Sequence, residues 1–141
     1  MSGARARPTA AHGWVAVGAA TGAMARWLVA GWLDSGAGPS GGAFPWATLA
    51  VNVGGSLLIG MLAGLVARRL LASVSLQLAL MTGFCGAFTT FSAFGLETVF
   101  LVRAGHPGLA MAYVLVSLPL WLAAAWAGYR LAAQGRWGAA R

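Results

Sequence analysis

Charged residues are scarce in this 141-residue chain: they make up 8% of the residues, whereas 60% are hydrophobic. A soluble domain of this size carries about a quarter charged residues. The low charge therefore excludes an ordinary soluble domain and indicates an all-α membrane protein. The length leaves room for one compact bundle and no second domain, so we expect residues 1–141 to form a single transmembrane domain.

Cysteine, lysine and acidic residues are also rare or absent. The single cysteine, Cys85, excludes an internal disulfide and a cysteine-rich metal site. All nine basic residues are arginines, and they stand at the ends of apolar segments rather than in one patch. This distribution indicates that the arginines set the orientation of the chain in the membrane rather than bind nucleic acid. We find no catalytic constellation, phosphate loop or redox motif, so the sequence does not indicate an enzyme.

Four apolar runs have the roughly 20-residue length that a helix needs to cross a bilayer. They predict spans at about 13–33, 45–67, 74–102 and 107–131, with a Gly/Ser/Pro-rich loop at 34–42. Pro45 suits the first turn of the second span. Most tryptophans lie near span ends, where we expect them to anchor the chain at the membrane interface: Trp14, Trp27, Trp32, Trp46, Trp121, Trp126 and Trp137.

The third span is too long for a straight crossing. At 1.5 Å per residue its 29 residues would extend about 43 Å, against a hydrocarbon core of about 30 Å. Either steep tilt or a break in the helix would absorb the excess. The segment GFCGAFTTFSAF (83–94) is where a break is easiest, because it holds two glycines and two adjacent threonines. Free backbone groups at such a break bind ions in transport proteins.

Polar residues repeat at helical spacing inside two spans. Thr48, Asn52 and Ser56 fall at i, i+4 and i+8 of the second span, and two glycines continue the row. Serine and glycine there are equally explained by close helix packing, whereas Asn52 favours a functional role or an interhelical hydrogen bond. Tyr113 and Ser117 repeat the spacing in the fourth span, although Tyr113 is also a candidate interfacial aromatic.

Two charged residues lie within the predicted spans away from their last two positions, where Arg130 stands. Arg26 follows Gly18 and Gly22 on one face of the first span, where the glycines suit helix packing. Arg26 either extends to the interface or attracts anions at a vestibule. Glu97 is the one acid inside a span, which makes it a functional candidate, and its place towards the span end equally allows capping or headgroup contact.

The polar and aromatic side chains within the predicted spans are mainly hydrogen-bond donors and phenyl rings. Phe84, Phe88, Phe91 and Phe94 are spaced by three or four residues. Hydroxyl and amide groups donate hydrogen bonds, and a phenyl ring has a positive edge. Such a lining suits a small, strongly hydrated anion and is poor for a cation.

Three motifs then resemble one family. GAATGAMARW (18–27) is similar to GGxxGAxxRY, with Ala19 and Trp27 differing. ATLAVNVGGSLLIG (47–60) is similar to GTLxVNxxGSFxxG, with Ala47 and Leu57 differing. GFCGAFTTFSAF (83–94) is nearly identical to the third signature, although Ala93 replaces its usual hydroxyl residue. In these motifs and in its four-span layout the chain resembles the Fluc (CrcB-type) fluoride channels.

The resemblance implies a passive, fluoride-selective channel that exports toxic cytoplasmic fluoride across a bacterial plasma membrane. It further implies an antiparallel, dual-topology dimer with two narrow pores, a third helix broken near its middle, and a structural Na⁺ at the dimer centre. The positions that match the family are the pore residues Phe91, Phe94, Asn52, Thr48, Tyr113, Ser117 and Glu97, the vestibule residue Arg26, and the sodium-binding carbonyls of Gly86 and Thr89.

The arginine distribution leaves the partner open. With the N-terminus inside, seven arginines fall on the cytoplasmic side and two, Arg26 and Arg103, towards the other. This bias favours one orientation, and hence an oppositely oriented homologue rather than a second copy as the partner. Two other functions remain as alternatives: a small four-span proton-coupled exporter that relies on Glu97, and a membrane scaffold whose polar residues serve packing only.

Overall fold

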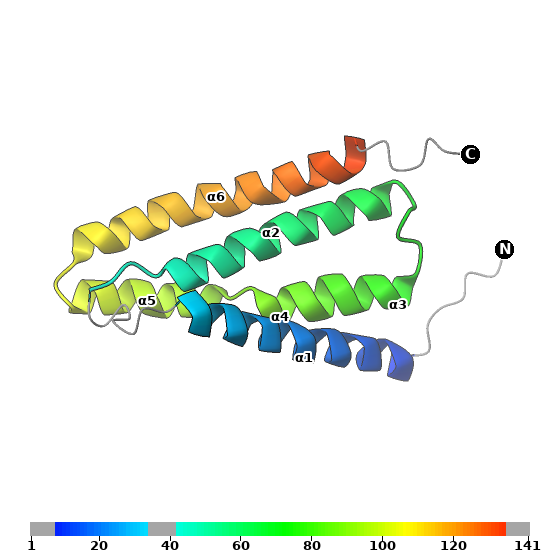
Figure 1. Ribbon diagram of the computed structural model, residues 1–141, viewed down its shortest axis with the longest axis horizontal. Helices are drawn as coiled ribbons and strands as arrows, with labels where there is room; N and C mark the ends of the chain where they lie inside the picture. The colour runs from blue at the N-terminus through cyan, green and yellow to red at the C-terminus, as the bar shows by residue number, and fades with distance from the viewer. Residues whose placement is uncertain (1–7, 34–41, 135–141) are drawn as a thin grey trace.

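The described part of the chain folds into four helical units that lie side by side (Figure 1). The computed structural model describes residues 8–33 and 42–134. Three units are single helices: α1 (Pro8–Leu33), α2 (Trp46–Ala67) and α6 (Pro107–Gln134). The third unit is divided into α3 (Val74–Gln77), the π-helical segment η2 (Leu78–Cys85), α4 (Gly86–Phe88) and α5 (Phe91–Arg103). The predicted all-helical fold class is confirmed.

Three of the four units are long and apolar enough to cross a membrane: Trp46–Ala67, Val74–Arg103 and Pro107–Gln134. The chain is thus a membrane protein by length and composition of its helices. The fourth unit, α1, has sufficient length at 26 residues but is less apolar, since it contains His12, Thr21 and Arg26. The crossing of α1 therefore stays a prediction.

The helix ends lie within five residues of the expected bounds, and the largest difference is the earlier start of α1. Pro45 is not in the first turn of α2. It is the N-cap residue, with φ −78° and ψ 70°, and the helix begins at Trp46. The loop at 34–41 lies outside the described residues, as do Arg5, Arg7, Arg136, Trp137 and Arg141.

Glycines bring α2 and α6 into backbone contact. A Cβ atom at Gly60 would overlap the Ala125 carbonyl oxygen, and one at Gly128 would overlap the Leu57 carbonyl oxygen. At Gly64 a Cβ would lie 2.8 Å from the Tyr129 carbonyl oxygen. Small residues permit this close approach between membrane helices. The glycines that continue the polar row of α2 therefore serve packing, as one of the two sequence interpretations held.

Glycines also bring α1 into backbone contact with the third unit. A Cβ atom at Gly18 would overlap the Ala79 carbonyl oxygen of η2, and one at Gly22 would overlap the Phe84 carbonyl oxygen. Gly83 of η2 reciprocates, because its Cβ would lie 2.6 Å from the Val15 carbonyl oxygen. Helix α1 is thereby held directly against the segment that precedes the break.

We expect Gly18→Ala to destabilise the protein, because the added methyl group meets backbone that cannot rotate away. Overpacking of this kind costs about 1–3 kcal/mol, which corresponds to a drop of about 5–10 °C in the midpoint of thermal unfolding. The measurement is loss of monodisperse protein after heating in detergent. Gly13→Ala in the same helix is the matched control, since a Cβ at Gly13 meets nothing within 4 Å. An equal effect of the two substitutions would contradict the packing argument.

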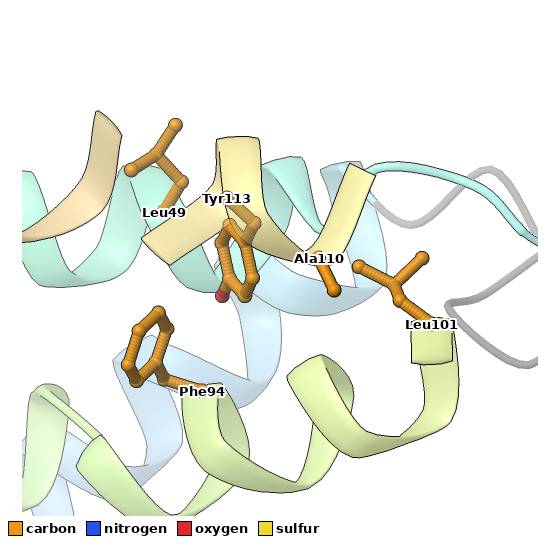
Figure 2. Packing of buried hydrophobic residues seen from close by; sticks show 5 residues of the cluster. All are labelled: Leu49, Phe94, Leu101, Ala110 and Tyr113. Atoms are coloured by element: carbon orange, nitrogen blue, oxygen red, sulfur yellow. The ribbon is translucent and has the colours of Figure 1, made fainter. Parts of the chain in front are cut away.

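The buried core lies between α2, α5 and α6, near the end of the bundle where α5 joins α6. It comprises Leu49, Phe94, Leu101, Ala110 and Tyr113, whose side chains converge in Figure 2. Leu101 and Tyr113 are completely buried. Most other large apolar side chains on α6 face outward, for example Leu115 and Leu122, which are 65% and 73% exposed. An apolar exterior around a small, partly polar interior is what a lipid solvent demands.

Candidate functional site

The third unit breaks between α4 and α5, at two threonines. Thr89 has φ −80° and ψ 160°, and Thr90 has φ −151° and ψ 117°, so both residues are extended. The third unit is therefore broken, as one of the two sequence interpretations held. Branched threonine side chains favour extended backbone, which accounts for the position of the break.

Asn52 of α2 holds the broken backbone. Its Nδ2 donates to the Thr90 carbonyl oxygen at 2.9 Å, and its Oδ1 accepts from the Thr90 amide at 2.8 Å. The Thr90 hydroxyl accepts from the Ala93 amide at 3.1 Å and thus caps α5. The bonds to the Thr90 and Ala93 amides replace helical hydrogen bonds that the break removes, whereas the Thr90 carbonyl also accepts the first hydrogen bond of α5 as its N-cap. At bilayer depth such replacement is required, because no lipid group accepts or donates.

This diversion leaves two carbonyl groups without their helical donors. In an uninterrupted helix the Thr90 amide would donate to the Gly86 carbonyl and the Ala93 amide to the Thr89 carbonyl. Asn52 and the Thr90 hydroxyl take those two amides instead. Gly86 is exposed, and no atom lies within 4 Å of the position that a Cβ would occupy there. The break also separates the Ala87 and Phe88 carbonyls from their helical donors, because Phe91 and Ser92 form the first turn of α5. Gly86 and Thr89, which the family resemblance assigns to sodium, are thus two of four neighbouring residues whose carbonyls lose their helical donors.

Glu97 lies inside the bundle, bound by two hydroxyl groups. Thr48 Oγ1 donates to its Oε1 at 2.6 Å, and Tyr113 Oη donates to its Oε2 at 2.8 Å. Thr48 and Tyr113 are both buried, so neither the interfacial reading of Tyr113 nor headgroup contact by Glu97 describes their position. Each hydroxyl has one proton to donate, and both protons are directed at the carboxylate.

Phe91 and Phe94 lie next to each other in different surroundings. Their ring centroids are 5.5 Å apart, yet Phe91 is 71% exposed and Phe94 only 6%. The Phe94 ring faces the Tyr113 ring at a centroid distance of 5.0 Å (Figure 2). Phe84 and Phe88 form a separate stack on the other side of the break, with centroids 5.5 Å apart. The phenyl ladder of the sequence is thus divided into two pairs by the break.

Two clefts meet at Thr90. One, of about 580 Å³, is lined by Arg26, Thr48, Glu97 and Ser92 among others. The other, of about 330 Å³, is lined by Asn52, Ser56, Phe91 and Trp121 among others. Thr90 lines both, so the extended residue at the break is their common wall. Arg26 therefore faces the same cleft as Glu97, and the predicted vestibule residue and pore residues are brought together.

Trp121 departs from the expected role of an interfacial anchor. It is half-buried, and its ring meets the Phe94 ring edge-on, with centroids 4.9 Å apart and an interplanar angle of 75°. The other described tryptophans are 47–86% exposed, which suits an anchor facing lipid. Spacing could have separated Trp121 from them, since it follows Tyr113 and Ser117 at i+8 and i+4 on one face of α6.

The arginines of the described residues divide between the two ends of the bundle. Arg68 and Arg69 lie in the turn after α2, and Arg130 lies near the end of α6, at the right-hand end in Figure 1. Arg103 ends α5 at the opposite end. Within residues 8–33 and 42–134 there is no group of three or more His, Cys, Asp or Glu side chains that could hold a metal ion.

The chain is small and apolar, one of its membrane-length helices is broken, and polar side chains fix the backbone at the break. Helical membrane proteins that transport ions use broken helices of this kind. A family model described as "CrcB-like protein, Camphor Resistance (CrcB)" matches residues 13–129. The chain belongs to this CrcB-type family.

Curated relatives cover most of the chain. A protein of Agrobacterium fabrum named "Fluoride-specific ion channel FluC" is 51% identical over 117 residues, which are 83% of this chain and 91% of the relative. "Fluoride-specific ion channel FluC 1" of Bradyrhizobium diazoefficiens is 42% identical over 135 residues, covering 94% and 92%. A protein of the same name in Symbiobacterium thermophilum is 45% identical over 120 residues, covering 84% and 95%.

Proposed function

We propose that this chain is a subunit of a fluoride-selective channel that releases cytoplasmic fluoride by passive permeation. The observation that carries the proposal is the break at Thr89 and Thr90, which Asn52 fixes and where Thr90 lines two clefts. The printed names of relatives at 42–51% identity support fluoride as the ion. Four spans, including α1, in the plasma membrane of a bacterium belong to the same proposal.

The proposed path follows the donors and ring edges around the break. A bare anion in an apolar medium costs tens of kcal/mol, so a pore must supply groups that replace its water. The positive edges of Phe91 and Phe94, together with Asn52, Ser117, Thr48 and Tyr113, are the groups available here. Arg26 raises the local concentration of anions in the cleft that it lines. Exclusion of larger anions then follows from pore width.

Glu97 has a defined part in this path. In the described conformation it accepts the hydroxyl protons of both Thr48 and Tyr113. Fluoride reaching this cleft competes with the carboxylate for those protons, so entry is coupled to rearrangement of the three residues. A proton-coupled exporter built on Glu97 is not favoured, because the relatives are named as channels. An enzymatic role is not proposed.

The residues fit a structural sodium ion. Gly86 and Thr89 have carbonyls without their helical donors next to the break, and carbonyl oxygens are ligands for hard cations. A bound Na⁺ would offset the partial negative charge of those oxygens. The carbonyls of Gly86 and Thr89 would hold it, and Asn52 would keep their competing amide donor away by binding the Thr90 N–H.

A second subunit completes the proposed site. Phe91 is 71% exposed, and Gly86 and Ser92 are also exposed. Gly86 exposes backbone and Ser92 a hydroxyl, and lipid offers neither a hydrogen-bond partner. An oppositely oriented subunit against this face would cover them and would bring two breaks together. The arginine bias favours a homologue in that role, and the homodimer is the alternative.

The deciding experiment is fluoride efflux from liposomes that contain this purified chain alone, with chloride efflux as control. We expect fast fluoride release and little chloride release if the homodimer suffices. Release that appears only after a homologous CrcB-type chain is co-reconstituted would support the heteromeric form. No fluoride release in either preparation would overturn the proposed function.

A further inference from the structure

Two buried hydrogen-bond donors on α6 have no partner among the residues that the structure describes: Ser117 Oγ and Trp121 Nε1. Ser117 is completely buried. The two residues are four positions apart and therefore share one helix face, one turn from each other. Buried polar groups in native proteins nearly always find a partner, so two neighbouring exceptions call for an explanation.

Neither donor is explained by the hydrogen bonds already described. Tyr113, one turn before Ser117, directs its hydroxyl at Glu97. One N–H of the Asn52 amide donates to Thr90, and its second N–H is left over. Ser117 Oγ and Trp121 Nε1 are thus the buried donors of the α6 row that the described hydrogen bonds do not use. An indole N–H only donates, so its partner must be an acceptor.

The surroundings of Trp121 also favour a hydrogen-bond acceptor as its partner. Its ring stands edge-on to Phe94 at 4.9 Å, and it lines the same cleft as Asn52 and Phe91. Ring edges and N–H groups carry positive partial charge, and Glu97 belongs to the lining of the other cleft. A small anion is an acceptor that matches this set of groups, whereas a cation finds no counter-charge there.

We propose that Ser117 and Trp121 form an anion-binding station in which the Trp121 indole N–H donates directly to fluoride. This rests on the proposed function and adds a specificity-determining residue to it. The Trp121 donor lies on the Asn52 side of the break, so that fluoride passes from the cleft of Arg26 to that of Trp121. A hydrogen-bond donor of fixed direction at this point favours an ion small enough to approach the indole closely.

The test combines a spectroscopic and a transport measurement. Indole resonances of ¹⁵N-tryptophan-labelled wild-type protein are recorded during titration with sodium fluoride, and separately with sodium chloride. We expect one indole N–H resonance to move with fluoride and not with chloride, and to be missing from the spectrum of Trp121→Phe. Fluoride efflux through Trp121→Phe should fall at least tenfold, because phenylalanine keeps the aromatic contact with Phe94 but has no donor.

Trp126→Phe is the matched control, since Trp126 lies on the same helix and is 63% exposed. It should conduct like wild type. If Trp121→Phe does not yield folded protein, Trp121→Tyr is used to assign the Trp121 indole resonance. The titration of wild-type protein tests fluoride binding to an indole N–H without either variant. Wild-type protein that conducts fluoride while no indole resonance responds would overturn the station and leave the proposed function intact. A wild-type protein without efflux would overturn the function itself.

Discussion

Asn52→Leu should abolish fluoride efflux and strongly destabilise the protein. Leucine has a similar volume but cannot bind the amide and the carbonyl of Thr90, which Asn52 holds at 2.8 and 2.9 Å. The Thr90 amide left unpaired costs about 1–3 kcal/mol, and lipid increases the cost, whereas the Thr90 carbonyl keeps the first hydrogen bond of α5. The measurements are efflux from liposomes and the fraction of protein that stays monodisperse after heating.

Asn52→Asp is the graded control for this substitution. Its carboxylate still accepts from the Thr90 amide, but it no longer donates to the Thr90 carbonyl. We expect a stability between those of wild type and Asn52→Leu. A leucine variant as stable and as conductive as wild type would show that other contacts fix the break.

Phe91→Leu should reduce fluoride efflux by about a hundredfold, equivalent to about 2.8 kcal/mol, while leaving the folded protein intact. Substitutions at exposed positions change stability by about 0.5 kcal/mol or less, and Phe91 is 71% exposed in the single chain. Leucine is apolar and nearly as large but has no ring edge. A loss of flux without loss of stability would therefore assign the ring edge to permeation.

Phe100→Leu on the same helix is the control, because Phe100 is half-buried and lines neither cleft. Its efflux should stay within a factor of about two of the wild-type value if the path is as proposed. Undiminished efflux through Phe91→Leu would remove this ring from the path.

Composition and hydrophobic run length were sufficient to predict helices with nearly correct ends, because a lipid solvent permits few alternatives to the helix. The break was predicted as one of two possibilities. Helical spacing alone could not decide it, since tilt also shortens a span. The break is fixed by Asn52, whose side-chain amide hydrogen-bonds to the backbone of Thr90, 38 residues away in the sequence. A tertiary contact of that kind leaves no trace in local periodicity.

Other features of the site were missed for related reasons. The π-helical segment η2 has no distinguishing residue pattern, and its backbone packs against the glycines of α1. Trp121 was grouped with the other tryptophans, although it continues the i, i+4 row of Tyr113 and Ser117, and its edge-on contact with Phe94 sets it apart in the structure. The hydroxyls of Thr48 and Tyr113 were expected to line a path for a small anion, and the sequence did not indicate that Glu97 accepts both of their protons in the described conformation.

The shared wall at Thr90 has an electrical consequence. Water that fills the two clefts lined by Thr90 would shorten the low-dielectric path beside this residue, so the transmembrane voltage would fall over less of the membrane thickness there. Moving one elementary charge through the whole voltage is worth about 2.3 kcal/mol per 100 mV. In the proposed channel, a cell with a negative interior would thereby drive fluoride outward past the position where Asn52 holds the backbone.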